Sequence, residues 1–383
     1  MPQIYLNNNS STKVAPVVLE AMIPYFYERY GNPSNLHTFG RDTREAVEQA
    51  RDQVALLLNA KPEEIYFTSG GTESNNLAIK GVFRSMADNS KHVITSTIEH
   101  SSVLYSVQYL EKAHYAKATY LKVDHHGKVD PNELEHSITD NTVLVSIMHS
   151  NNEVGTFQPI KQLCAITQKK GVYFHTDATA TAGKALLDVK DLGVDLLTIS
   201  AHKFHGPKGV GALYVKEGVK IEKIIYGGEQ ERGLRAGTED VPGIIGLGKT
   251  TILAKDFLQQ RGQEKIKILR GYFENKIKTK ISDVKINGHP TERVVNVSNI
   301  SFANVDHELF VECLDKEGIK VSAGSACSPG QRIVSHVLRA MQVEEKYLDS
   351  QIRFGLSRYT TKEEIDYTVK VVRKLVGQLR KHN

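Results

Sequence analysis

The stretch LLTISAHKFHGPKGVGALYV, residues 196–215, has two apolar runs on either side of a polar loop. Short runs rich in Leu, Ile, Val and Thr predict buried strands, here LLTIS and VGALYV. The loop between them holds Lys203, and its glycines Gly206 and Gly209 permit close approach of the backbone to a ligand. Lys203 is therefore either a solvated surface lysine, which is the default, or a reactive amine at the end of a strand.

The same alternation of short apolar runs and helix-like stretches extends from about residue 60 to residue 215. Five further runs predict strands: EIYFT, HVITS, ATYLKV, TVLVSIM and VYFHT. Stretches with helical periodicity, such as ESNNLAIKGVFRSM and IKQLCAITQKKG, separate many of them. This order of elements predicts an α/β fold in which a mostly parallel sheet lies between layers of helices.

The alternation of apolar runs and helix-like stretches changes after residue 240. One long helical stretch, residues 244–277, leads away from the predicted sheet, and the runs beyond it predict a smaller α+β unit. We therefore expect a large domain over residues 14–255 and a small domain formed by residues 1–13 together with 256–383.

Two local motifs suggest binding sites that their context does not support. GIIGLGKT, residues 243–250, fits the phosphate-loop pattern, but the polar RAGTEDVP that precedes it is no strand, so a helix is favoured. The histidines of HKFH, His202 and His205, and the pair His125–His126 have no acidic or cysteine partners at ligand spacing. The sequence predicts no metal site.

Composition describes an ordinary globular protein. The chain has 383 residues, 40% apolar and 24% charged, which is longer than one simple core needs. The net charge of +5 is small and interspersed, which argues against direct nucleic-acid binding. The N-terminal MPQIYLNNNSSTKV lacks the features of a secretory signal or transit peptide, and no apolar run approaches the roughly 20 residues that span a membrane.

The cysteines, Cys164, Cys313 and Cys327, are odd in number and far apart, with no Cys-x-x-Cys pattern. This usage argues against a disulfide framework and predicts a reducing, cytoplasmic protein. Cys164 and Cys313 lie in apolar helical patterns and resemble buried core cysteines. Cys327 lies among Gly and Ser residues in SAGSACSPG, where an accessible thiolate is expected.

Three features meet at one end of the predicted sheet. Lys203 follows a strand, where open α/β sheets bind ligands, and a neutral lysine forms an imine with a carbonyl compound. Asp177 ends the neighbouring run VYFHT, where it either caps the following turn or faces a ring nitrogen. Gly70, Gly71 and Thr72 follow EIYFT and begin a helix, which favours a phosphate. An amine, an acid and a phosphate cradle are the requirements of pyridoxal phosphate (PLP).

With these residues, the chain resembles a cysteine desulfurase of the NifS/IscS type, within the class V aminotransferase family. The resemblance covers nearly the whole length, in the family's order and spacing, through YGNPSNLHTFG, FTSGGTESNNLAIKG, HTDATATAGK, SAHKFHGPKGVGALYV, GGEQERGLRAGTEDVPGIIG, SAGSACS and IRFGLSRYTTKEEIDYT. It implies PLP fold type I, a homodimer, L-cysteine as substrate, and a sulfur-acceptor protein, either an iron–sulfur scaffold or a tRNA-thiolation enzyme.

The resemblance also implies roles for individual residues. Lys203 would hold PLP covalently and move protons, and Asp177 would pair with the pyridine nitrogen. His100 would stack on the ring and assist proton transfer, Arg353 would hold the substrate carboxylate, and Cys327 would accept the sulfur as a persulfide. The remaining cofactor contacts would come from Gly71, Thr72, Asn152, Ser200, His202 and Thr238. Asn152 would also touch the substrate, and Thr238 would reach the phosphate of the partner subunit.

The sequence departs from the family in two places. Ala180 stands where the family has a glutamine that donates to the phenolic oxygen of PLP, and a hydrogen bond to a charged acceptor contributes about 1.5–3 kcal/mol. Asn7, Ser10 and Ser11 replace the family's acid, alanine and threonine. Alternatives to the desulfurase are therefore a class V aminotransferase, a selenocysteine lyase or cysteine sulfinate desulfinase, and a catalytically impaired relative that acts as a binding protein.

Overall fold

The computed structural model describes residues 3–86, 91–324 and 334–381, so the predicted sulfur acceptor Cys327 lies outside the described residues. Its largest sheet has seven strands in the order β2-β8-β7-β6-β5-β3-β4. The strands are β2 (Ile65–Thr68), β3 (Lys91–Ser96), β4 (Ala116–Leu121), β5 (Thr142–Ser146), β6 (Tyr173–Asp177), β7 (Leu196–Ser200) and β8 (Gly211–Val215). The pairs β3–β4, β3–β5, β5–β6 and β6–β7 are parallel, whereas β8 is antiparallel to both neighbours. The prediction of a mostly parallel sheet is confirmed.

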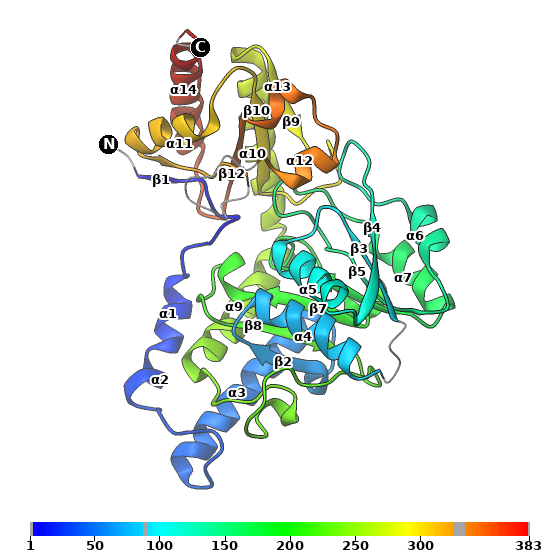
Figure 1. The fold of residues 1–383 in the computed structure, drawn as a ribbon. Helices are drawn as coiled ribbons and strands as arrows, with labels where there is room; N and C mark the ends of the chain where they lie inside the picture. The colour runs from blue at the N-terminus through cyan, green and yellow to red at the C-terminus, as the bar shows by residue number, and fades with distance from the viewer. Residues whose placement is uncertain (1–2, 87–90, 325–333, 382–383) are drawn as a thin grey trace.

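Helices cover both faces of this sheet (Figure 1). The helices in this part of the chain are α1 (Pro16–Met22), α2 (Pro24–Tyr27), α3 (Thr38–Leu58), α4 (Gly71–Arg84), α5 (Ser101–Lys112), α6 (Pro131–Ser137), α7 (Ile160–Lys169), α8 (Val189–Leu192) and α9 (Val241–Gln259). Successive strand residues serve opposite faces, because side chains alternate along a strand. Leu196 of β7 packs with residues of α4 and α5, whereas Leu197 packs with residues of α3, α7 and α9.

A second part of the chain is built around two small sheets, one of β1 and β11 and one in the order β12-β10-β9. Its strands are β1 (Ile4–Tyr5), β9 (Val284–Asn287), β10 (Val297–Phe302), β11 (Ile319–Lys320) and β12 (Gln351–Gly355). Its helices are α10 (Gly262–Lys280), α11 (His307–Lys316), α12 (His336–Ala340), α13 (Glu345–Leu348) and α14 (Lys362–Leu379). Strand β1 and helix α14 lie together in this part, near the two ends of the chain (Figure 1). The predicted domain division, with its boundary at residue 255 inside α9, stays a prediction.

The long helix predicted over residues 244–277 is wrong in one respect, because the structure breaks it into α9 and α10. Arg261 takes a left-handed conformation, with φ of 56°, and ends the continuity of the backbone hydrogen bonds. Gly262 begins α10, and a Cβ atom there would lie 2.2 Å from the ring of Phe257. GIIGLGKT lies inside α9, so the interpretation as a helix is confirmed.

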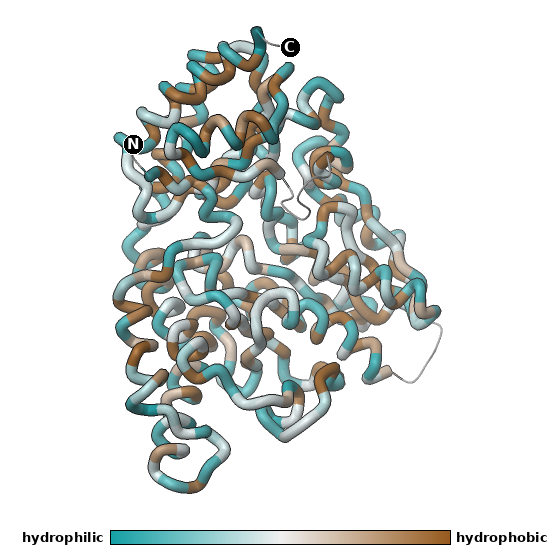
Figure 2. The backbone as a smooth tube through the Cα atoms, turned by 60° about the vertical axis from the view of Figure 1, so that its left-hand side comes forward, coloured by the Kyte–Doolittle hydropathy of each residue, from teal (hydrophilic) through white to brown (hydrophobic). Residues whose placement is uncertain are grey.

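Hydrophilic and hydrophobic residues are interspersed in short stretches along the backbone tube (Figure 2). Within the described ranges, none of the helices has both the length and the apolar character needed to cross a membrane.

Candidate active site

Lys203 lies directly after β7, in a short turn of 3₁₀ helix formed by Ala201–Lys203. The N-terminal segment that follows β1 crosses this turn, and Thr12 donates from its backbone nitrogen and its hydroxyl to the carbonyl oxygen of His202, both at 2.9 Å. The Nζ of Lys203 donates to the carbonyl oxygens of Asn9, at 2.7 Å, and Ser10, at 3.0 Å. The amine is thus held in the interior of the site, which favours the reactive-amine interpretation over a surface lysine.

The electrostatic surroundings of Lys203 favour its neutral form. Burial lowers the pKa of Lys203 to about 8, repulsion from Arg353 acts in the same direction, and attraction to Asp177 opposes both. A second lysine lies close by, since burial and repulsion from Lys203 lower the pKa of Lys184 to about 7. Burial, with repulsion from Lys203 and other lysines, also lowers the pKa of His202 to about 4. This concentration of cationic groups suits an anionic ligand.

Asp177 is the last residue of β6, and β6 pairs directly with β7. Its carboxylate is buried and accepts hydrogen bonds from Asn75 Nδ2, at 2.8 Å, and from the backbone nitrogen of Thr179, at 2.9 Å. One carboxylate oxygen therefore caps the turn after β6, while the amide of Asn75 holds the other. The interpretation as a cap of the following turn is confirmed, and the pairing with a ring nitrogen stays a prediction.

The start of α4 lies close to the end of β7. Gly70 has φ of +138°, which favours glycine, and a Cβ atom on it would lie 3.6 Å from Ser200 Oγ. A Cβ atom on Gly71 would lie 3.1 Å from Thr179 Oγ1, a buried hydroxyl that has no hydrogen-bond partner among the described residues. Free backbone amides, Ser200 and an unpaired hydroxyl at one helix start are a donor set that fits a phosphate group.

Arg353 lies on β12 and is buried. It donates from Nη1 to the carbonyl oxygen of Asn152, at 3.1 Å, and from Nη2 to Ser10 Oγ, at 2.8 Å. The structure thus brings Arg353 and Asn152 together beside the N-terminal segment that also receives Lys203. A guanidinium in this place suits a carboxylate-bearing substrate.

Comparison with known proteins agrees with this geometry. The model of the aminotransferase class-V family matches residues 4–368. The chain belongs to the class-V aminotransferase family. It is 48% identical over 379 residues to a cysteine desulfurase IscS of Dictyoglomus turgidum, covering 99% of this chain and 95% of that relative.

This full-length identity shows that the class-V chain is a cysteine desulfurase, and two solved structures share its fold. A NifS-like protein has a TM-score of 0.92 and 37% identity, covering 98% of this chain and 100% of that one. The structure named "SspA in complex with cysteine" has a TM-score of 0.82 and 34% identity, covering 94% and 100% of the two chains. The resemblance inferred from the sequence is confirmed. Class-V membership implies PLP, and Lys203, Asp177 and the donors at the start of α4 fit that cofactor.

Two predicted residues of this class-V site are not brought to Lys203 by the described part of the chain. Cys327 lies outside it, as stated above. Thr238 lies on an exposed loop before α9, consistent with a residue that contacts another molecule. His100, in contrast, begins α5 and lies close enough to Asp177 and Lys203 for their charges to influence its pKa, which burial lowers below the ordinary value.

Reasoning from the sequence missed four contributors to this class-V site. Asn75 and the backbone nitrogen of Thr179 donate to the Asp177 carboxylate. The carbonyl groups of Asn9 and Ser10 accept from the Lys203 amine. Asn75 and Thr179 lie inside quoted motifs, so their neighbourhood was a signal. The two carbonyl groups gave none, because a backbone oxygen leaves no mark in a sequence.

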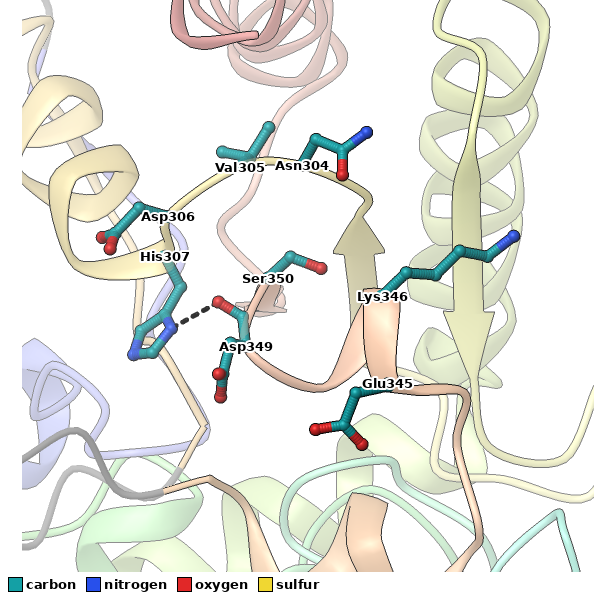
Figure 3. Close-up of a pocket in the computed structure, with 8 residues that line it drawn as sticks. All are labelled: Asn304, Val305, Asp306, His307, Glu345, Lys346, Asp349 and Ser350. Atoms are coloured by element: carbon teal, nitrogen blue, oxygen red, sulfur yellow. Dashed lines mark hydrogen bonds between the residues drawn. The ribbon is translucent and has the colours of Figure 1, made fainter. Parts of the chain in front are cut away.

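The described residues also contain a surface pocket of about 220 Å³ away from this site, shown in Figure 3. His307 points toward the loop before β12, where its Nδ1 donates to the carbonyl oxygen of Asp349 at 2.6 Å. Carboxylates of Asp306, Glu345 and Asp349 share the rim with Lys346. Among the described ranges there is no group of three His, Cys, Asp or Glu residues that could hold a metal ion.

Proposed function

We propose that this cysteine desulfurase removes the sulfur of free L-cysteine, releases L-alanine and leaves a persulfide on Cys327. The observation that carries the proposal is the Lys203 amine itself, held by the carbonyl oxygens of Asn9 and Ser10 and near enough to Arg353 and Asp177 for both charges to act on its lowered pKa. The full-length similarity to cysteine desulfurases supports it.

PLP, when bound, supplies an electron sink for the electrons of the broken substrate bond. The chain supplies the remaining functions. Asp177 would keep a proton on the pyridine nitrogen by its charge, and the start of α4 with Gly71, Thr72, Ser200 and His202 would hold the phosphate. Lys203 would hold the cofactor in the resting enzyme and, once the substrate amine has replaced it there, would take the proton from the substrate Cα as a neutral amine. Such a base works best when its pKa lies near the working pH.

The substrate contacts follow from Arg353 and the segment that carries Cys327. Arg353, joined by the neighbouring Asn152, would bind the α-carboxylate of cysteine. The Cys327 thiolate then attacks the substrate sulfur, so that one S–S bond forms and the Cβ–S bond breaks. The electron pair stays with the carbon fragment, which takes up protons and leaves as alanine. No external oxidant is required, because the two electrons that the sulfur loses in forming the S–S bond stay with the carbon fragment, which is reduced to alanine.

The described ends of that segment support the role of Cys327. Ser335 Oγ donates to Glu153 at 2.6 Å, next to Asn152 in the chain, and His336 Nε2 donates to the carbonyl oxygen of Glu99 at 3.0 Å, next to His100. Cys327 follows the other described end, Gly324, by three positions in the sequence.

We also propose a homodimer in which Thr238 reaches the phosphate of the partner subunit. Helix α2 and the start of α3 project away from the sheet (Figure 1), and large apolar side chains are exposed in this region. Those exposed by about half or more are Phe26, Tyr27, Tyr30, Leu36 and Phe39. An exposed apolar patch of this kind is typical of an interaction surface.

The persulfide would pass to an iron–sulfur scaffold or a tRNA-thiolation enzyme, in the cytoplasm, where thiols stay reduced.

Two variants test the function. Lys203→Ala should lose the absorbance of bound PLP and all release of alanine, whereas Cys327→Ser should keep the absorbance and lose sulfide release. Cys313→Ser, on α11, is the matched control for loss of a thiol and should keep both activities. Selenocysteine and cysteine sulfinate, assayed beside cysteine, separate the alternative substrates. Sulfide release by Cys327→Ser would refute the thiol assignment, and keto-acid production in place of alanine would show an aminotransferase.

A further inference from the structure

A continuous chain of hydrogen bonds joins Asp177 to His100 through Asn75 and Ser102, two residues that have no role in the proposed reaction. Asn75 Nδ2 lies 2.8 Å from Asp177 Oδ2 and 2.8 Å from Ser102 Oγ. Ser102 Oγ lies 2.8 Å from His100 Nδ1. Asn75 comes from α4, Ser102 and His100 from the start of α5, and Asp177 from β6, so three separate elements meet along this line.

The carboxylate fixes the direction of the hydrogen bonds in this chain. A carboxylate accepts only, so Asn75 must turn its NH₂ group toward Asp177. The second hydrogen of that NH₂ group then points to Ser102 Oγ, which therefore accepts. Asn75 is 1% exposed, so water cannot easily supply an alternative partner.

The Ser102 hydroxyl has one hydrogen, and His100 Nδ1 is the acceptor that lies next to it. The backbone nitrogen of Ser102 also donates to His100 Nδ1, at 3.1 Å, as the cap of α5. Two donors thus converge on Nδ1, which leaves no place for a hydrogen on that atom. A neutral imidazole carries one hydrogen, so it must lie on Nε2.

We propose that Asn75 and Ser102 are positioning residues that hold His100 as the neutral tautomer with its hydrogen on Nε2. The inference rests on the proposed function, because it concerns the residue expected to face the PLP ring. His100 is exposed in the described chain and its side-chain hydrogen bonds there involve Nδ1, so Nε2–H is left for a bound group. In this state His100 donates a hydrogen bond to the site and takes no proton from it, which leaves Lys203 as the base.

The charged groups around His100 come from several elements. Asp177 and Glu153 favour its protonated form, while Lys203 and His336 disfavour it, and burial lowers its pKa. Donors at Nδ1 act in the same direction as burial, since they hold the lone pair that a second proton would need. Removing one donor should therefore raise the pKa of His100.

The tautomer is measured directly by NMR of protein labelled with ¹⁵N-histidine, with PLP bound and after its removal. The His100 signals are assigned from their absence in His100→Gln. Wild type should show hydrogen on Nε2 only. Ser102→Ala should raise the His100 pKa by about 0.5–1 unit and lower kcat about fivefold with little change in KM, the equivalent of one hydrogen bond. Ser102→Thr, which restores a hydroxyl, should recover both values.

Ser106→Ala is the matched control. Ser106 is a buried serine on the same helix whose hydroxyl donates to the carbonyl oxygen of Ser102, and its loss should leave the His100 pKa unchanged. Hydrogen on Nδ1 in the wild type, or equal pKa values in Ser102→Ala and Ser106→Ala, would overturn the inference. Because no turnover is needed for the NMR measurement, a protein without desulfurase activity would refute the proposed function and leave the tautomer assignment intact.

Discussion

Attachment of PLP to the protein freed of cofactor should depend on pH through the amine of Lys203. Burial and Arg353 lower the pKa of this amine to about 8, against about 10.4 for an ordinary lysine. The neutral amine is the nucleophile, and it prevails only above the pKa. At pH 7 about one Lys203 amine in ten is neutral, compared with about one in 2,500 for an ordinary lysine. The site should therefore react about 250-fold faster than an ordinary lysine of equal intrinsic reactivity.

The assay mixes cofactor-free protein with PLP at a series of pH values and follows the absorbance of the covalent product. The rate constant should rise through pH 8 and then level off. Nα-acetyl-lysine, treated in the same way, should show a rate that continues to rise toward pH 10. Borohydride reduction followed by mass spectrometry should place the adduct on Lys203.

A change at Arg353 tests the cause of the shift. Arg353→Met removes the positive charge that disfavours a protonated Lys203, so the midpoint of the rate profile should move to higher pH. A wild-type profile that keeps rising to pH 10, or an adduct on another amine, would refute the assignment of a lowered pKa to Lys203.

Three further outcomes are expected. Ala180→Gln should tighten PLP binding about tenfold or more, measured by equilibrium titration, because it adds a donor to a charged oxygen; unchanged affinity would mean that another group already fills that role. Arg51→Met should lower the free energy of unfolding in urea by about 3–5 kcal/mol, since it leaves the buried Glu231 carboxylate without its partner at 2.8 Å. Asn7→Asp should raise the KM for cysteine severalfold with kcat less affected, because a carboxylate beside Ser10 would compete for Arg353, and an unchanged KM would argue against that coupling.

The seven strands of the large sheet could be predicted because each is a short apolar run with polar residues or glycine beside it. Strand β7 shows why this works, since all five of its residues are buried and a strand covered on both faces needs no polar position. The break between α9 and α10 could not be predicted in this way. Helical periodicity continues across it, and only the left-handed Arg261 with the side chain of Phe257 against Gly262 determines where it falls.

The candidate site, like the fold, has a part that could be predicted from the sequence and a part that could not. Lys203 and Asp177 could be predicted because a reactive side chain directly after a buried strand is visible in one segment. The partners of these residues come from distant segments: Asn75 lies 102 positions from Asp177, and Asn9 lies 194 positions from Lys203. A single sequence carries no signal for such pairings, since many asparagines would serve equally well until the fold brings one of them into place.

The departures of the N-terminal segment from the family are connected to one another in space. Ser10 Oγ donates to Asn7 Oδ1 at 2.7 Å and accepts from Arg353 Nη2 at 2.8 Å, and Ser11 Oγ lies 3.3 Å from His202 Nδ1. The changes thus converge on the two residues assigned to the substrate carboxylate and the cofactor phosphate. An uncharged Asn7 leaves the positive charge of Arg353 less neutralised than the family's acid would. That charge lowers the pKa of Lys203 and, in the proposed role of Arg353, would also attract the substrate carboxylate, so we expect the segment to affect substrate binding and amine reactivity together.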